Sequence, residues 1–263
     1  MIEEVDTKGA KKAVLESVSW DIKIKRSDRR MVIKSPRKPE IKLKGEEIRI
    51  IVKSSKTELP FFNVFNVSVE ESEEGLLEVE IPSSILFLEI NTVSGDATCE
   101  GLSLKNIKSV SVSGGIEIDK ISSREAFFRT LSGDIRINSS EIDKIVLSSV
   151  SGDVKIKHSF GREWDITTTS GDIELIFPGY PNARILPRTM RGDIVTSLPY
   201  ILEGKEYVFG EGKLRISVKS ASGDLSLRSE TSENEYVKRI LRMLYEGKIS
   251  KEEAERLIKE LRF

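Results

Sequence analysis

Acidic side chains that could do chemistry recur at one fixed spacing in this sequence. The tripeptide Ser-Gly-Asp, or a close variant, begins at Ser94, Ser113, Ser132, Ser151 and Ser170, so each copy starts 19 residues after the one before. Stacked carboxylates are hard oxygen ligands of the kind that calcium takes. Carboxylates about 5 Å apart are also the acid and nucleophile of retaining glycosidases. Calcium binding and glycoside hydrolysis are therefore the two chemistries to weigh.

A structural role for the tripeptide is the interpretation we favour over both. Gly permits the left-handed backbone that a sharp corner needs, and Asp can accept hydrogen bonds from nearby backbone N–H groups as in an Asx turn. A uniform column gives every carboxylate the same environment, whereas an acid and a nucleophile need different pKa values. Against calcium, the second copy has Gly115 in the Asp place, and the Asp-rich nonapeptide repeat of calcium-binding β-rolls is absent.

We therefore expect no catalytic, cofactor-binding or metal-binding residues, and a corner motif instead. The residues assigned to that corner are Gly95, Asp96, Gly133, Asp134, Gly152, Asp153, Gly171, Asp172, Gly192, Asp193, Gly223 and Asp224. The exceptional copies, at Trp20, Gly115 and Arg191, are the first places to look for a partner surface.

The other reactive side chains are isolated. Cys99 is the only cysteine, which excludes an intramolecular disulfide, and its apolar column predicts a buried core position. His158 is the only histidine, and we expect it on the surface or in a turn. No Gly-rich phosphate loop is present, and Lys and Arg alternate with Glu and Asp, so we expect no nucleic-acid partner.

The elements that position the tripeptides follow from the residues around them. Three and five positions after each Ser lie apolar residues with a polar residue between them, which predicts a strand with one buried face. These apolar positions are Ala97, Ile116, Ile135, Val154 and Ile173, then Cys99, Ile118, Ile137, Ile156 and Leu175. An apolar column six positions before the Ser and a hydroxyl column two before it predict a second strand. Two strands and a turn per repeat predict an all-β fold, a parallel β-helix or β-solenoid of about 19-residue rungs.

The ends of the repeat array are less regular. Val18–Ile24 resembles a degenerate first rung with Trp20 in the Gly position. Leu59–Val69 is rich in Phe and is interpreted as an apolar edge, a loop under the rungs or a partner surface, with core packing favoured. After Asp172 the period lengthens to Arg191-Gly192-Asp193 and then to Ser222-Gly223-Asp224, which predicts an inserted hairpin before the final rung.

The last residues change to a helical period. Val237, Ile240, Leu241 and Leu244 form one apolar face. Gly247 is a predicted C-cap, and Ser250 to Glu253 is a capping box that opens a second helix with Ala254, Leu257, Ile258 and Leu261 on its apolar face. Two such short helices are not stable alone, so they must cap the open end of the solenoid or pair with another chain.

Composition sets the broad class. The 263 residues carry 42 basic and 43 acidic side chains, for a net charge of −1, which gives no general attraction to nucleic acid or anionic membrane. The sequence has no Gln and many Lys and Glu, a pattern typical of thermophiles. No signal peptide or membrane span is evident, so we expect a cytoplasmic protein.

The tripeptides and the segment Phe209–Leu227, which ends in Ser222-Gly223-Asp224-Leu225-Ser226-Leu227, resemble the bacterial and archaeal "putative adhesin" domain family. The resemblance covers residues 14–229. The tail from Leu241 to Leu261 is similar to the short SHOCT-like helical module, which accompanies such domains in some envelope-stress proteins. These resemblances imply a non-catalytic role in binding, surface association or stress sensing, and they supply no catalytic residues.

The sequence therefore predicts a non-enzymatic scaffold. We expect residues 1–229 to form the solenoid and residues 230–263 a helical hairpin for capping or oligomerisation. The expected partners are another protein or a second copy of the chain, held through the helices. The alternative is a carbohydrate-active or metal-dependent enzyme that uses carboxylates on the solenoid face.

Overall fold

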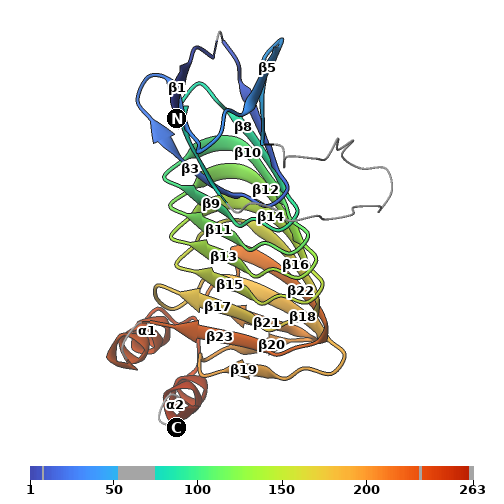
Figure 1. Cartoon of the computed structure of the whole chain (residues 1–263). Coiled ribbons are helices and arrows are strands. Elements are labelled where there is room, and N and C mark those ends of the chain that lie inside the picture. Colours follow the sequence, from blue (N-terminus) through green and yellow to red (C-terminus); the bar gives the residue numbers. More distant parts are fainter. Residues whose placement is uncertain (8, 53–74, 231–232, 261–263) are drawn as a thin grey trace.

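The computed structural model describes residues 1–7, 9–52, 75–230 and 233–260. The predicted feature at Leu59–Val69 lies outside these residues. The chain is a stack of β-rungs, with its N-terminal rungs at one end and two short helices beside the other (Figure 1). Two long sheets form the two sides of the stack, and one continuous hydrophobic core runs between them.

The first sheet has eleven strands. In spatial order these are β1 (Ile2–Val5), β4 (Met31–Lys34), β7 (Leu76–Pro82), β3 (Asp21–Ser27), β9 (Ala97–Glu100), β11 (Ile116–Asp119), β13 (Ile135–Asn138), β15 (Val154–Lys157), β17 (Ile173–Phe177), β23 (Leu225–Ser229) and β19 (Ile194–Thr196).

The second sheet has twelve strands. They run in the order β20 (Ile201–Glu203), β21 (Glu206–Phe209), β18 (Ala183–Thr189), β22 (Leu214–Ser222), β16 (Glu163–Ser170), β14 (Glu141–Ser149), β12 (Ser122–Thr130), β10 (Ser103–Val110), β8 (Phe87–Thr92), β2 (Lys12–Ser17), β6 (Glu47–Val52) and β5 (Glu40–Lys44). The fold is therefore mostly β and solenoid-like, as predicted.

The central pairings are parallel and align equivalent positions of successive tripeptide copies. Ile116 pairs with Ala97 on one side and with Ile135 on the other, and Ile135 pairs in turn with Val154. The apolar columns predicted to face inward are buried, and Cys99 is fully buried among them. Alternation along each strand therefore places one face in the core and the other in solvent.

The rungs at both ends are not stacked in chain order. Val18–Ile24 does form a rung, since Ile22 pairs with Ala97, but its strands β2 and β3 lie between those of two later segments. At the other end Ile173 pairs with Leu225, so the final rung stacks directly on the Asp172 rung, and Ile194 of the Arg191-Gly192-Asp193 segment is outermost. The first and last rungs along the chain thus each have a neighbouring strand on both sides, so neither forms the exposed edge of the stack.

Aromatic side chains close the C-terminal end of the core. A hairpin is inserted before the final rung, as predicted, but β20 and β21 form it. Residues 214–218, expected to follow Tyr207 in the hairpin, belong instead to β22, which pairs with β16 and β18. Tyr207 and Phe209 of this hairpin pack near Tyr200, with ring centroids 4.7 and 6.2 Å away, and Tyr180 lies edge-on to Phe209 at 6.2 Å. Phe209 is fully buried. The hairpin and these rings cover the apolar end of the stack.

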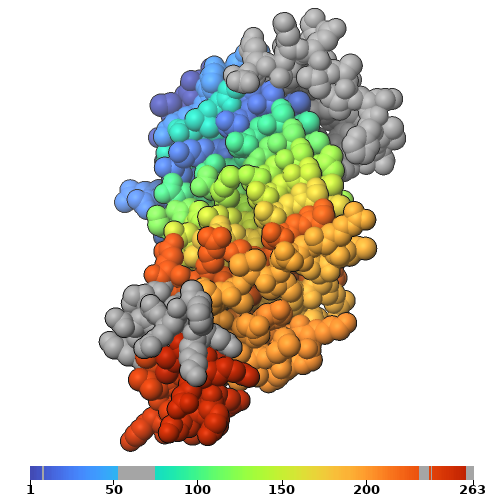
Figure 2. Space-filling view, turned by 90° about the horizontal axis from the view of Figure 1, so that it is seen from below, coloured from blue at the N-terminus to red at the C-terminus, as the bar shows by residue number. Residues whose placement is uncertain are grey.

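The helices α1 (Glu233–Tyr245) and α2 (Lys251–Glu260) have a small core of their own, built on Ile240, Ile249, Ala254 and Leu257. Gly247 has φ of 68°, as a C-cap requires, and the amides of Ser250 and Glu253 bond reciprocally to each other's side chains as a capping box. Leu241 was expected in the apolar face but is 49% exposed, because the buried face turns toward Ile240. Viewed from this end, the helices lie beside the hairpin region (Figure 2).

Candidate functional site

The glycines of the Ser-Gly-Asp corner are required by the distance between rungs. A Cβ built on Gly133 would overlap the carbonyl oxygen of Gly114, and one built on Gly152 would overlap that of Gly133. The same relation holds for the other corner glycines. Of these glycines only Gly223 has a positive φ, of 151°. The prediction that they provide a left-handed backbone is therefore wrong, and close stacking of the backbones is the physical reason for Gly.

The aspartates of the corner form a ladder from rung to rung. The Oδ1 of Asp134 accepts a bond from the amide of Asp153 at 3.0 Å, and that of Asp153 accepts one from Asp172 at 2.9 Å. The ladder continues through Asp224 to Asp193. The predicted Asx turn would have bonded each Asp within its own turn. Each carboxylate instead bonds to the next rung, because the stacked amides are the closest donors.

The ladder has one gap and two distinctive ends. It starts at Asp21, whose carboxylate accepts the amide of Asp96, and Asp96 accepts the amide of Gly115. Gly115 has no carboxylate, so it offers no side-chain acceptor to the next amide in the stack, that of Asp134. At the far end Asp193 lies in the outermost rung, where no further amide follows. The other exceptional residues lie near the two ends. Trp20 belongs to the first rung along the chain, and Arg191 belongs to the outermost rung at the C-terminal end of the stack.

Buried hydroxyls support the same corner from inside. Ser111, Thr130 and Ser149 accept the amides of the glycines three residues later, at 2.8 to 3.0 Å. The Ser of each tripeptide donates both its amide and its hydroxyl to a carbonyl of the preceding rung, as Ser132 does to Val112. Most polar groups of the corner therefore bond to a neighbouring rung, which makes the corner rigid.

The left-handed residues lie at the opposite corner, after the shorter strand of each rung. Gly101, Lys120, Ser139 and His158 occupy equivalent positions there, with φ of 69°, 52°, 47° and 48°. His158, expected at a surface or turn, is in this turn, and its Nε2 lies 2.8 Å from Glu230. Lys157 pairs with the same carboxylate at 2.6 Å, and these two contacts together lower the pKa of Glu230.

An aliphatic ridge runs along the outside of the Ser-Gly-Asp corner. The residue before each Ser points into solvent, so Val112, Leu131 and Val150 are 39%, 47% and 40% exposed. Met190 continues this column in the outermost rung and is 83% exposed. We call these four residues and Val93 the ridge. Successive rungs bring Val93, Val112, Leu131 and Val150 about 5 Å apart, whereas the rungs of Thr169 and Ala221 lie between Val150 and Met190.

The corner offers little catalytic chemistry. Except for Asp193 at the end of the ladder, its carboxylates share one arrangement, in which an oxygen accepts a backbone amide. Asp134 differs by a further ion pair with Arg136 at 2.7 Å. This near-uniform column offers no pair of contrasting environments of the kind that an acid and a base need. Burial raises the pKa of the Cys99 thiol to about 12, which makes it a poor nucleophile. Within the described residues, His, Cys, Asp and Glu do not gather in groups of three that could hold a metal ion.

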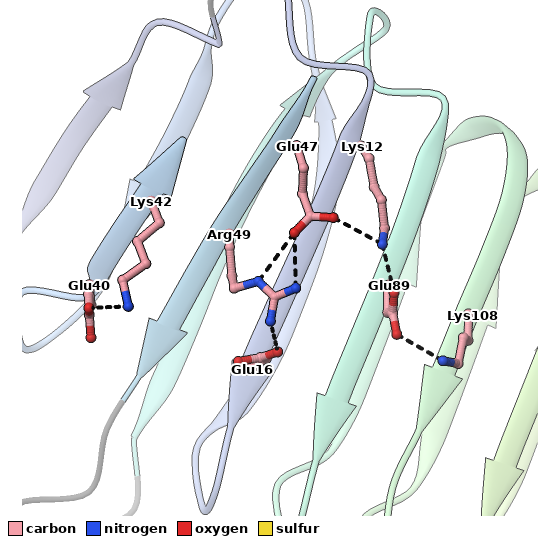
Figure 3. Close-up of polar contacts among 8 residues, drawn as sticks. All are labelled: Lys12, Glu16, Glu40, Lys42, Glu47, Arg49, Glu89 and Lys108. Atoms are coloured by element: carbon pink, nitrogen blue, oxygen red, sulfur yellow. Dashed lines mark hydrogen bonds and ion pairs between the residues drawn. The ribbon is translucent and has the colours of Figure 1, made fainter. Parts of the chain in front are cut away.

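An ion-pair network covers the first rungs of the twelve-stranded sheet on its outer face (Figure 3). Lys12 joins Glu47 to Glu89, at 3.2 and 3.0 Å, and Lys108 reaches Glu89 at 2.8 Å. Burial alone would raise the pKa of Glu89, but hydrogen bonds from the two lysines lower it to about 2. Arg49 extends the network by bonding Glu47 and Glu16. The sequence reasoning missed this network, although Lys108 and Glu89 are 19 residues apart.

Beside the network lies a shallow hollow over β8, β10, β12 and β14. It has two adjoining parts, of about 470 and 440 Å³. Phe87, Phe127 and Val146 line the first part, and Lys105, Arg124 and Lys144 the second. We call these six residues the hollow.

The comparisons with known proteins fit this architecture. The family model described as Toastrack DUF4097 matches residues 10–239. The chain belongs to this Toastrack family. A model of the SHOCT-like domain matches residues 235–263, which confirms the resemblance of the tail. No curated protein matches the sequence significantly.

Several solved structures are similar to this Toastrack chain. A "putative lipid binding protein" from Parabacteroides distasonis is 15% identical, with a TM-score of 0.50 over 86% of this chain and 96% of that one. A "putative cell adhesion protein" from Clostridium sporogenes is also 15% identical, with a TM-score of 0.42 over 88% and 98%. A "putative adhesin" from Bacteroides fragilis is 11% identical, with a TM-score of 0.45 over 87% and 96%. In the described part of the chain, no helix is long and apolar enough to cross a membrane.

Proposed function

We propose that the chain is a non-enzymatic scaffold of about 19-residue rungs that binds a protein partner along the ridge. The observation that carries the proposal is the exposure of Val112, Leu131 and Val150 on consecutive rungs. Contiguous exposed apolar surface on a folded protein is typical of an interaction site. The backbone beneath is held by bonds to both neighbouring rungs, so a partner would meet a preformed surface and little ordering entropy would be lost.

Site-specific photo-crosslinking in the native host tests this proposal. A photoreactive phenylalanine at position 131 is expected to give an adduct of discrete mass, and Val150→Asp is expected to abolish it. The matched control places the same group at Arg136, which is exposed on the outer face of the neighbouring strand β13. Equal crosslinking at positions 131 and 136, or an adduct unaffected by Val150→Asp, would refute the ridge as the binding surface.

We further propose that residues 230–263 are a separate unit that serves self-association. Its small core is its own, and it contacts the solenoid through polar pairs: Arg239 lies 5.2 Å from the ring centre of Tyr180, and Lys248 lies 3.8 Å from Glu211. Leu241 and Tyr245 remain 49% and 93% exposed. Deleting residues 233–263 is expected to lower the solution mass to that of one chain. An unchanged mass would leave capping as the role of the helices.

A further inference from the structure

The hollow differs from the adjacent ion-pair network in whether its cationic side chains are paired with carboxylates. Lys12 and Lys108 each contact at least one carboxylate. The charged groups of Lys105, Arg124 and Lys144 make no hydrogen bond or ion pair with other side chains among the described residues, although they line the same hollow. We propose that the hollow binds a single-chain anionic amphiphile, such as a fatty-acid carboxylate.

The acidic residues beside these cations are already engaged. Glu125 accepts a hydrogen bond from the side-chain Nδ2 of Asn106 at 2.8 Å, and Asp143 pairs with Arg162 at 3.0 Å. The register places Lys144 directly opposite Glu125, and Lys105 and Arg124 just before the paired residues Asn106 and Glu125. Three cations therefore face two carboxylates in this part of the hollow, and Asp143 is also paired with Arg162, so a net positive charge is available to an anionic head group.

The other end of the hollow suits an alkyl chain. Phe127 and Val146 are opposite each other on β12 and β14, and both are half-buried on the outer face. Phe87 is 36% exposed on β8, opposite Asn106, and lines both parts of the hollow. A pocket with an apolar wall and a few charged groups at one end is the usual form of a site for an amphiphilic small molecule.

The backbone of the sheet favours an alkyl chain over a peptide. Strands β8, β10, β12 and β14 are each paired on both sides, so their N–H and C=O groups are occupied within the sheet. A peptide lying in the hollow could therefore bond its own backbone groups only to side chains or water, and not to the backbone of the sheet. An alkyl chain has no such groups, and its only polar requirement is met at the cationic end.

The proposal is tested by measuring the binding of tetradecanoate to the full-length chain by titration calorimetry. We expect the acid to bind, its methyl ester to bind at least tenfold more weakly, and inorganic phosphate not to compete. Arg124→Glu combined with Lys144→Glu is expected to weaken binding of the acid at least tenfold, and Phe127→Ser several-fold. Arg129→Glu is the matched control, because Arg129 is exposed on the same strand β12 outside the hollow.

Three results would overturn the proposal: no binding of the acid, equal binding of acid and ester, or equal losses in the double variant and in Arg129→Glu. Competition by phosphate with no effect of Phe127→Ser would indicate a site for free anions and would also contradict it. The thermal midpoint of each variant shows whether it is folded, and Phe127→Leu provides a second tail variant if Phe127→Ser is not. Crosslinking at the ridge does not depend on any of these outcomes, so the two proposals fail separately.

Discussion

The chain turns at two corners in each rung, and different physical limits select the residues at the two corners. At the Ser-Gly-Asp corner, Gly133 and its equivalents have no room for a Cβ, and φ there is not positive except at Gly223. At the opposite corner, Gly101 has φ of 69° and open space around the position of a Cβ. The first corner is limited by packing between rungs, and the second by the conformation of its own backbone.

This difference explains why the two corners look unlike in the sequence. A steric limit of this kind favours Gly, so the first corner repeats one residue type in every copy except the first rung, where Trp20 occupies the position. A left-handed conformation costs an L-residue about 1–2 kcal/mol and is tolerated when the structure holds it. The second corner therefore accepts Lys120, Ser139 and His158 as well as Gly101.

The largest expected effect comes from adding one methyl group at each corner. Gly133→Ala should destabilise the fold by about 3 kcal/mol, because the new Cβ forces neighbouring rungs apart. Gly101→Ala should cost only about 1 kcal/mol, since the added strain is confined to one residue. Urea unfolding of both variants measures the difference. Equal losses would contradict the distinction between the corners.

The carboxylate ladder gives the next effect. Asp153→Ala should cost about 1.5 kcal/mol, because the amide of Asp172 loses a charged acceptor. Asp193→Ala is the control: its carboxylate lies at the end of the ladder and accepts no amide from a further rung, so its loss should stay within about 0.5 kcal/mol. Thermal unfolding of the two variants measures the difference in stability. A similar loss of stability in both would show that the bond between rungs contributes nothing.

At the second corner a substitution should stabilise the protein. Ser139→Gly is expected to raise the free energy of unfolding by about 0.5–1 kcal/mol, because it relieves a left-handed L-residue. Ser140→Gly should do the opposite, since the Ser140 hydroxyl accepts the amide of Ile121 and donates to the carbonyl of Asn138. Denaturant midpoints of the two variants give the sign, and a destabilised Ser139→Gly would be the adverse result.

The smallest effect concerns the gap in the ladder. Gly115→Asp should stabilise the fold by about 0.5 kcal/mol, because its carboxylate can accept the amide of Asp134 and a Cβ there meets only ordinary contacts, at 3.4 Å and beyond. Gly115→Ala separates the backbone contribution from that of the carboxylate. If Asp is no better than Ala in calorimetry, the ladder does not extend through this position.

Much of the architecture could be predicted from the regular columns. Ile116, Ile135 and Val154 alternate with polar residues, and that alternation alone places them inside. The outward direction of Leu131 could not be predicted, because the bend interrupts the alternation there. The stacking of Ile173 on Leu225 was hidden as well, since sequence order says nothing about which distant segment returns to fill a rung.

The site residues were found by type, but their physical roles were not. Repeated Gly and Asp indicate a corner, but only the three-dimensional structure distinguishes a left-handed turn from a close contact between rungs. The left-handed column escaped notice because Gly101, Lys120, Ser139 and His158 share no chemistry. The cations of the hollow carry no signal of their own, since paired and unpaired lysines look alike in a sequence.

Asparagine substitution at the two corners tests the central claim most directly. Asn tolerates a left-handed backbone better than Ala does, but it has the same Cβ. We predict that Gly101→Asn changes the free energy of unfolding by less than about 0.5 kcal/mol. Gly133→Asn should lower it at least as much as Gly133→Ala does, by about 3 kcal/mol. If Asn restored most of the stability that Ala removes at Gly133, a left-handed backbone would be the reason for glycine there, and the account of close rung packing would be wrong.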